Sequence, residues 1–198
     1  MSELLKKQNY GVEVEFTGIT RAMAAKAVAE VIGSTVTGPD HTCYHTRIIR
    51  DSQGRKWKIM RDSSIIPVRK TGNENMDEYR VEFVTPILKY DDLETLQAII
   101  RKFREIGGVP HASCGIHIHV DGANHTATSL RRLVNFMYSR QEIIYDALAV
   151  GSRKNRWCLP VCKNLLDTMK KDKNITTDSV EKTVSYTHLR AHETSQDL

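Results

Sequence analysis

The amino-acid sequence predicts an α+β fold in which helices cover one face of a β-sheet. Three segments alternate apolar and polar residues, as half-buried strands do: residues 10–17, 78–85 and 114–121. Three longer segments space their apolar residues as amphipathic helices do: residues 20–32, 91–106 and 126–150. Because the apolar strand faces need cover, we expect the helices on that side and a polar concavity on the other.

The first predicted strand, residues 10–16, reads YGVEVEF. Successive side chains on a strand point to opposite faces, so Glu13 and Glu15 share one face and lie about 6.6 Å apart. Two carboxylates at this spacing can hold a divalent metal ion. Solvated glutamates on a half-exposed strand are the simpler interpretation of these seven residues alone.

A helix is predicted next, over residues 20–32, closed by Gly33. Residues 43–50 and 56–60 then flank the turn-forming sequence Asp-Ser-Gln-Gly, which favours a β-hairpin whose second strand delivers Asp62 at its end. Residues 70–77, rich in Gly, Asn and Glu, are expected to form a loop, either a lid or a tolerated insertion.

The strand predicted over residues 78–85 places Arg80 and Glu82 on its polar face. After the helix over residues 91–106, the strand over residues 114–121 places His117 and His119 on its polar face. A lone His-x-His pair is more often an exposed alternation than a ligand pair, but here it accompanies three glutamates on strands. Hard oxygen ligands and imidazoles of this kind bind Mg²⁺ or Mn²⁺. The side chains that could converge on the polar face are Glu13, Glu15, Asp62, Glu82, His117 and His119.

The last predicted elements are the helix over residues 126–150, a basic loop over residues 152–160 and a short amphipathic helix over residues 161–171. The 198 residues suit one domain, and 40% hydrophobic with 27% charged residues is typical of a globular protein. No apolar run is long enough to span a membrane, and no signal-peptide core follows the start, so we expect a cytoplasmic protein. The four cysteines lack the paired spacing of zinc ribbons.

Five motifs together resemble the amidoligase family, whose members are similar to glutamine synthetase and γ-glutamylcysteine ligase. They occur in family order between about residues 8 and 162: residues 11–16 (GVEVEF), 57–63 (WKIMRDS), 81–86 (VEFVTP), 114–120 (CGIHIHV) and 153–160 (RKNRWCLP). The resemblance implies a curved, mainly antiparallel sheet, a glutamine synthetase-like catalytic domain that is incomplete here, and a concave face binding ATP and Mg²⁺ or Mn²⁺. It also implies amide-bond formation between a small-molecule or peptide carboxylate and an amine, through an acyl phosphate.

By this resemblance, specific side chains take on roles. The expected metal ligands are Glu13, Glu15, Glu82 and His117. Asp62 and His119 are expected in the metal or nucleotide site, with catalytic roles. Arg80, Arg153 and Arg156 are expected to bind the nucleotide, and the last two to act on phosphate or acyl phosphate, although a solvated basic loop explains residues 153–156 equally well.

The end of the chain departs from the family pattern. The family continues beyond the arginine-rich loop into further helices and a late strand, so residues 1–183 are expected to form an amidoligase-like domain lacking its C-terminal part. Residues 184–198 resemble translated sequencing-adapter read-through and are expected to be a non-native or disordered tail.

Two rival functions are compatible with parts of the sequence. The run His117-Ile-His-Val-Asp121 followed by His125 resembles the zinc ligands of metallo-β-lactamase-type hydrolases, which lie in a loop, whereas the alternation here favours a strand. That interpretation also leaves the three glutamates unexplained. The net charge of +5 and the pI of about 9.0 allow a basic nucleic-acid-binding domain. No aromatic-interleaved basic ladder supports a nucleic-acid partner.

Overall fold

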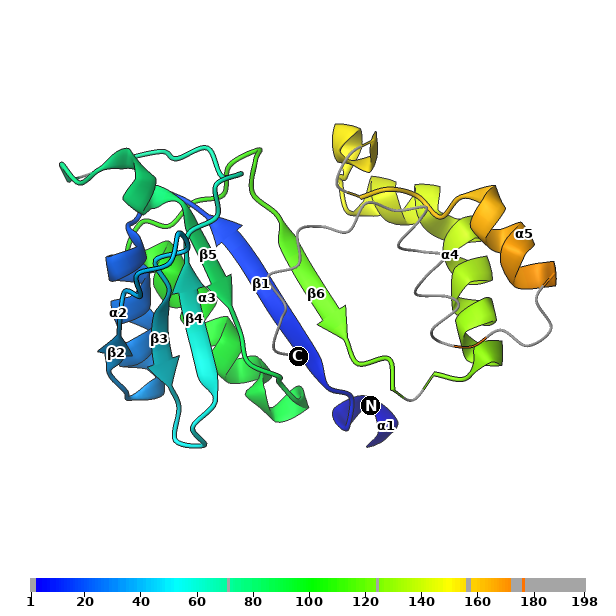
Figure 1. Cartoon of the computed structure of the whole chain (residues 1–198), viewed down its shortest axis with the longest axis horizontal. Coiled ribbons are helices and arrows are strands. Elements are labelled where there is room, and N and C mark those ends of the chain that lie inside the picture. Colours follow the sequence, from blue (N-terminus) through cyan, green and yellow to red (C-terminus); the bar gives the residue numbers. More distant parts are fainter. Residues whose placement is uncertain (1–2, 71, 124, 156–157, 172–175, 177–198) are drawn as a thin grey trace. The chain divides into compact units, whose positions relative to one another are not determined.

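The computed structural model describes residues 3–70, 72–123, 125–155, 158–171 and 176. They belong to two compact units, Met1–Asp121 and Gly122–Leu198. The N-terminal unit contains the sheet and the two helices that pack on it, and the second unit is helical (Figure 1). The predicted α+β class is therefore confirmed.

One antiparallel sheet organises the N-terminal unit, with the strand order β2-β3-β4-β5-β1-β6. Its strands are β1 (Tyr10–Phe16), β2 (Val36–Thr37), β3 (Arg47–Arg50), β4 (Lys56–Met60), β5 (Val81–Val84) and β6 (Ile116–Val120). The predicted hairpin is confirmed as β3 and β4, which pair around the turn at Asp51. The three strands with alternating sequences, β5, β1 and β6, are neighbours, so their polar faces form one surface.

Helices α2 (Arg21–Ile32) and α3 (Leu93–Glu105) lie on one face of this sheet (Figure 1). Thr20 caps α2 by accepting a hydrogen bond from the Met23 N–H, and Gly33 ends the helix in a left-handed conformation with φ of 67°. The short helix α1 (Glu3–Lys6) and the 3-10 helices η1 (Met76–Tyr79) and η2 (Tyr90–Asp92) complete the unit.

Aromatic side chains fill the space between the helices and the sheet. Phe16 stacks on Phe103 of α3 at a ring-centroid distance of 4.8 Å, and Phe83 meets Phe103 edge to face at 5.3 Å. Trp57 stacks on Phe83 at 6.0 Å. Full burial of one such ring contributes about 1.5–3 kcal/mol, so this cluster gives the carboxylate-bearing strands a rigid base.

Neither α2 nor α3 covers the apolar face of β6, although the sequence predicted that helices would cover the apolar strand faces. Ile116, Ile118 and Val120 are 67%, 67% and 60% exposed. The reason lies in the strand order, because α2 and α3 pack over the strands that bear Phe16, Trp57 and Phe83, while β6 lies at the edge. The third predicted helix belongs to the second unit instead.

The second unit contains α4 (Ala127–Ala147), the 3-10 helix η3 (Gly151–Asn155) and α5 (Lys163–Lys171). Thr126 caps α4 with a capping box that includes Ser129. Leu165 and Met169 of α5 pack against Leu130 and Val134 of α4. Among the described residues, none of the helices is both long and apolar enough to cross a membrane. The predicted tail over residues 184–198 lies outside the described residues.

Candidate metal centre

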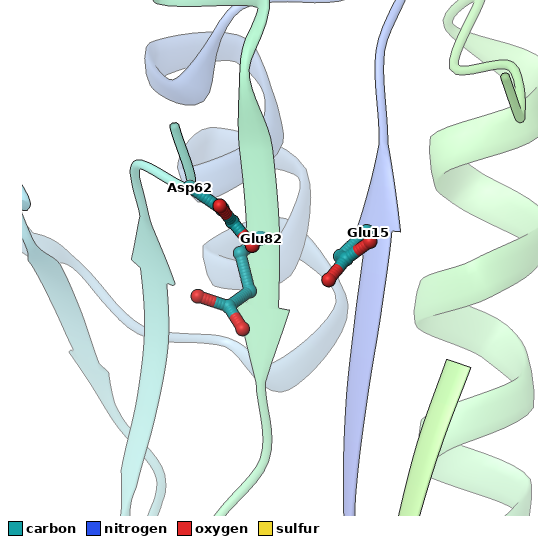
Figure 2. Close-up of side chains that lie close together, drawn as sticks. All are labelled: Glu15, Asp62 and Glu82. Atoms are coloured by element: carbon teal, nitrogen blue, oxygen red, sulfur yellow. The ribbon is translucent and has the colours of Figure 1, made fainter. Parts of the chain in front are cut away.

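Three carboxylates from separate parts of the chain meet on the sheet face opposite the helices. Glu15 on β1 lies directly opposite Glu82 on β5 in the strand register. Glu82 in turn lies opposite Met60 of β4, and Asp62 follows two residues later, just past the end of that strand. Oxygen atoms of Glu15, Asp62 and Glu82 all lie within 4.8 Å of one another, and Figure 2 shows the three side chains together.

The electrostatics of this group indicate unbalanced negative charge. Glu82 is 6% exposed, and burial, together with the charges of Glu13, Asp62 and Glu15, raises its pKa to about 8. Burial also raises the pKa of Glu15, although the Gly115 N–H donates to Glu15 Oε2 at 2.7 Å and opposes the shift. The Ser64 N–H donates to Asp62 Oδ1 at 2.7 Å.

Glu13 and the two histidines form a second polar group on the same face. Glu13 lies opposite His117 in the register, and His117 Nδ1 is 3.0 Å from Glu13 Oε2. This hydrogen bond is the main cause of both a lowered pKa of Glu13 and a raised pKa of His117. His119 Nε2 lies 3.3 Å from Glu13 Oε1, at ion-pair distance but without hydrogen-bond geometry, and is a buried atom without a hydrogen-bond partner.

The structure thus divides the side chains that the sequence placed together. Glu15 and Glu82, two of the predicted metal ligands, are joined by Asp62, which the sequence placed in a catalytic role. Glu13 and His117, the other two, pair with each other, and His119 lies beside them. Of the described residues, Glu15, Asp62 and Glu82 form the group of three ligand atoms close enough to share a cation.

The predicted arginines have different settings. Arg80 donates from Nη1 to the carbonyls of Ser63 and Ile65, and its Nε lies 3.4 Å from Asp77 Oδ1. Its guanidinium therefore engages protein groups of the same unit. Arg153 lies on η3 in the second unit, where its N–H donates to the Val150 carbonyl. Arg156 lies outside the described residues.

The His-x-His-x-Asp run lies on and directly after a strand, not in the loop that zinc hydrolases use. His117 and His119 face Glu13 from β6. Asp121 Oδ2 accepts a hydrogen bond from Asn9 Nδ2 at 3.1 Å, and His125 Nδ1 lies 3.1 Å from Ser129 Oγ. The expected strand conformation is confirmed, and Asp121 and His125 have partners of their own.

Lys58 is a candidate that sequence reasoning missed. It lies on β4 opposite Val84, which pairs in turn with Glu13, so Lys58, Glu13 and His117 lie on one row across the sheet. Its side chain is half-buried, and among the described residues its ammonium has no hydrogen-bond or ion-pair partner. The signal that could have found it is the alternation of β4, but only the pairing of β4 with β5 shows which face it shares.

The carboxylate group fits a hard divalent cation. Mg²⁺ and Mn²⁺ prefer carboxylate oxygens, and a cation would compensate the burial and the mutual repulsion that together raise the pKa of Glu82 to about 8. Three carboxylates from two strands and a loop end also leave coordination positions for other oxygen ligands, as is usual for Mg²⁺.

Comparison with known protein families agrees with the motifs. A family described as "Putative amidoligase enzyme" matches residues 6–197. The chain belongs to this family. Amidoligase family membership supports an enzyme of the ligase class, and the resemblance seen in the five sequence motifs is confirmed. The curated proteins and the solved structures contain no match to the chain.

Glu82→Gln should change how stability depends on pH in metal-free protein. Since the pKa of Glu82 is raised from 4.5 to about 8, the folded state keeps a proton that the unfolded state has lost between these values. The free energy of unfolding should therefore fall as pH rises through this window. The contribution of Glu82 to the slope is up to about 1.4 kcal/mol per pH unit.

Urea unfolding in EDTA at several pH values between about 5 and 8 measures how the free energy of unfolding of the wild type and of Glu82→Gln depends on pH. The Glu82→Gln protein should show a flatter dependence than the wild type, and excess Mg²⁺ should stabilise the wild type more than the variant at the upper end. Parallel pH profiles for the two proteins would contradict the proposed environment of Glu82.

Proposed function

We propose that this chain carries the metal and nucleotide site of an ATP-dependent carboxylate-amine ligase, which forms an amide bond through an acyl phosphate. Two findings support the proposal: membership of the amidoligase family and the convergence of Glu15, Asp62 and Glu82. The observation that carries it is geometric: one oxygen of each of Glu15, Asp62 and Glu82 lies within 4.8 Å of the others, and a buried carboxylate in such a group needs a proton or a cation to compensate it.

In this proposal Glu15, Asp62 and Glu82 hold Mg²⁺ or Mn²⁺. When bound, the metal and ATP supply charge neutralisation at the phosphate oxygens and the phosphoryl group that activates a substrate carboxylate. The chain's own contribution is to hold the three carboxylates in place before the cation arrives. The antiparallel register does this for Glu15 and Glu82, which are cross-strand neighbours.

His117 supplies a cationic donor beside the carboxylates. Its Nδ1 is committed to Glu13, and that hydrogen bond raises the pKa of His117, so the doubly protonated ring persists to higher pH. The protonated ring has a second N–H, on Nε2, which can donate to an anionic substrate oxygen. His119 Nε2 faces the same carboxylate, 3.3 Å from Glu13 Oε1. Glu13 orients both rings.

Lys58 supplies a fixed positive charge on the same face. A half-buried ammonium without a protein partner among the described residues is suited to an anionic ligand. Lys58 pairs with Val84, which pairs in turn with Glu13, so Lys58 and Glu13 lie on the same face of the sheet. We assign it to the phosphates of the nucleotide. Arg153 and Arg156 remain proposed phosphate-binding residues, and the proposed substrates are a small-molecule or peptide carboxylate and an amine.

Glu15→Gln should weaken metal-dependent nucleotide binding. The substitution keeps the shape of the side chain but removes one ligand charge, so affinity for ATP in the presence of Mg²⁺ should fall roughly tenfold or more. Titration calorimetry with ATP, in Mg²⁺ and separately in EDTA, measures this. Glu94→Gln, at an exposed position of α3 paired with Arg101, is the matched control and should bind as the wild type does.

The reaction itself can be tested before the amine substrate is known. Hydroxylamine traps an acyl phosphate as a hydroxamate, so wild-type protein incubated with ATP, Mg²⁺ and a panel of carboxylates should form hydroxamate only with its own acid. Glu15→Gln should form none. ATP binding that is equally strong in EDTA, or that survives in Glu15→Gln, would argue against the ligase site.

Lys58→Met should weaken phosphate binding without affecting the metal. Loss of one charge-assisted contact corresponds to about 1.5–3 kcal/mol, or roughly 10- to 150-fold in affinity. Inorganic tripolyphosphate titrated with Mg²⁺ present tests the contact, and Mn²⁺ alone should bind unchanged. Lys56→Met is the control, because Lys56 lies two residues away on the same face of β4 but is exposed. Equal losses in the two variants would exclude a specific role for Lys58.

A further inference from the structure

Asp62 needs support that the sheet does not give it. β4 ends at Met60, so no strand pairing of that strand extends to Asp62. Besides the backbone hydrogen bond from the Arg61 N–H to the Tyr44 carbonyl and the burial of Ile65, the segment is held by Arg80, whose Nη1 donates to the Ser63 carbonyl at 2.6 Å and also to the Ile65 carbonyl. Arg80 precedes Glu82 by two residues, so its side chain connects the strand that bears Glu82 with the backbone that follows Asp62.

The carboxylate of Asp77 contacts two arginines near Asp62. Arg61, the residue directly before Asp62, donates from Nε to Asp77 Oδ1 at 2.8 Å and Oδ2 at 2.9 Å. Arg80 Nε lies 3.4 Å from Asp77 Oδ1. The backbone before Asp62 and the arginine that holds the backbone after it are therefore both tied to Asp77.

Asp77 is itself held in place. It lies in η1, where its N–H donates to the Asn75 side-chain oxygen at 3.0 Å. Arg21, 1% exposed at the start of α2, donates to the Asp77 carbonyl and to the Arg80 carbonyl, the latter at 3.2 Å. The position of Asp77 is thus coupled to the packed helix and not only to the surface.

We propose that Asp77 is a positioning residue that sets where Asp62 lies relative to Glu82, and so sets the affinity of the site for a divalent cation. This inference rests on the proposed metal site. It assigns a function to a residue in the segment 70–77, and it gives Arg80 an indirect role through the backbone of Ser63 and Ile65.

Glu78 offers a matched control in the same network. It is adjacent to Asp77 in η1, and the side chains of the two are 32% and 33% exposed. Glu78 accepts from Arg21 at 2.6 Å and lies 3.5 Å from Arg47, so its partners are at the starts of α2 and β3. Removing its charge breaks a close ion pair without breaking the contacts to Arg61 and Arg80.

The experiment compares Mn²⁺ binding by full-length wild type, Asp77→Asn and Glu78→Gln. Free Mn²⁺ is quantified by electron paramagnetic resonance, and urea unfolding is recorded for each protein. Both variants should lose stability, but only Asp77→Asn should lose Mn²⁺ affinity, by roughly tenfold or more. A merely structural role would move stability and leave Mn²⁺ affinity equal in the two variants.

Arg80→Lys keeps a positive charge near Asp77 but cannot bridge two carbonyls in the same way, and it should also weaken Mn²⁺ binding. This variant decides the matter if Asp77→Asn does not fold. Wild-type affinity in Arg80→Lys, or equal affinity in Asp77→Asn and Glu78→Gln, would overturn the inference. Failure of the wild type to bind Mn²⁺, or unaltered binding by Glu82→Gln, would instead overturn the proposed metal site beneath it.

Discussion

The structure holds three carboxylates close together on one face of the sheet, against their mutual repulsion. Glu15 and Glu82 are held face to face by an antiparallel register, and Asp62 is brought to them from the end of β4. Taking carboxylates out of water costs several kcal/mol per ion unless a proton or a cation compensates. In the protein alone, a proton on Glu82 provides that compensation, which is why its pKa lies near 8.

Carboxylates can be kept this close only if the strands that bear them are held rigidly by the rest of the structure. The aromatic cluster of Phe16, Phe83 and Phe103 anchors the opposite face of the strands that bear Glu15 and Glu82. The carboxylates therefore cannot move apart without disturbing close packing. Beyond the end of β4, the ion pairs of Asp77 with Arg61 and Arg80 add to the burial of Ile65 in holding the segment around Asp62. The apolar core and the arginine network thus support the same group of side chains from two directions.

Residue alternation was enough to predict the strands β1, β5 and β6, the faces of their side chains, and the main helices, but the predicted start of β5 at residue 78 was wrong because residues 78 and 79 lie in η1. Alternation assigns a side chain to a face but does not assign its partner, because strand register depends on residues far apart in the chain. The sequence placed six polar side chains on one face, Asp62 among them, but only the register shows that Asp62 meets Glu15 and Glu82 while Glu13 pairs with His117. Asp77 lies in a segment predicted as a loop. Lys58 can be placed on the same face as the carboxylates only from the pairing of β4 with β5. The expectation that helices cover every apolar strand face does not hold for α2 and α3, which pack over other strands while β6 lies at the edge of the sheet.

We propose that Glu15, Asp62 and Glu82 together bind one divalent cation. The most direct test is an anomalous difference map from crystals of the protein grown with Mn²⁺ at about pH 8, where Glu82 can give up its proton. We expect a peak about 2.0–2.3 Å from oxygens of all three carboxylates. A peak at His117 and His119 alone, or ordered carboxylates with no peak between them, would contradict it.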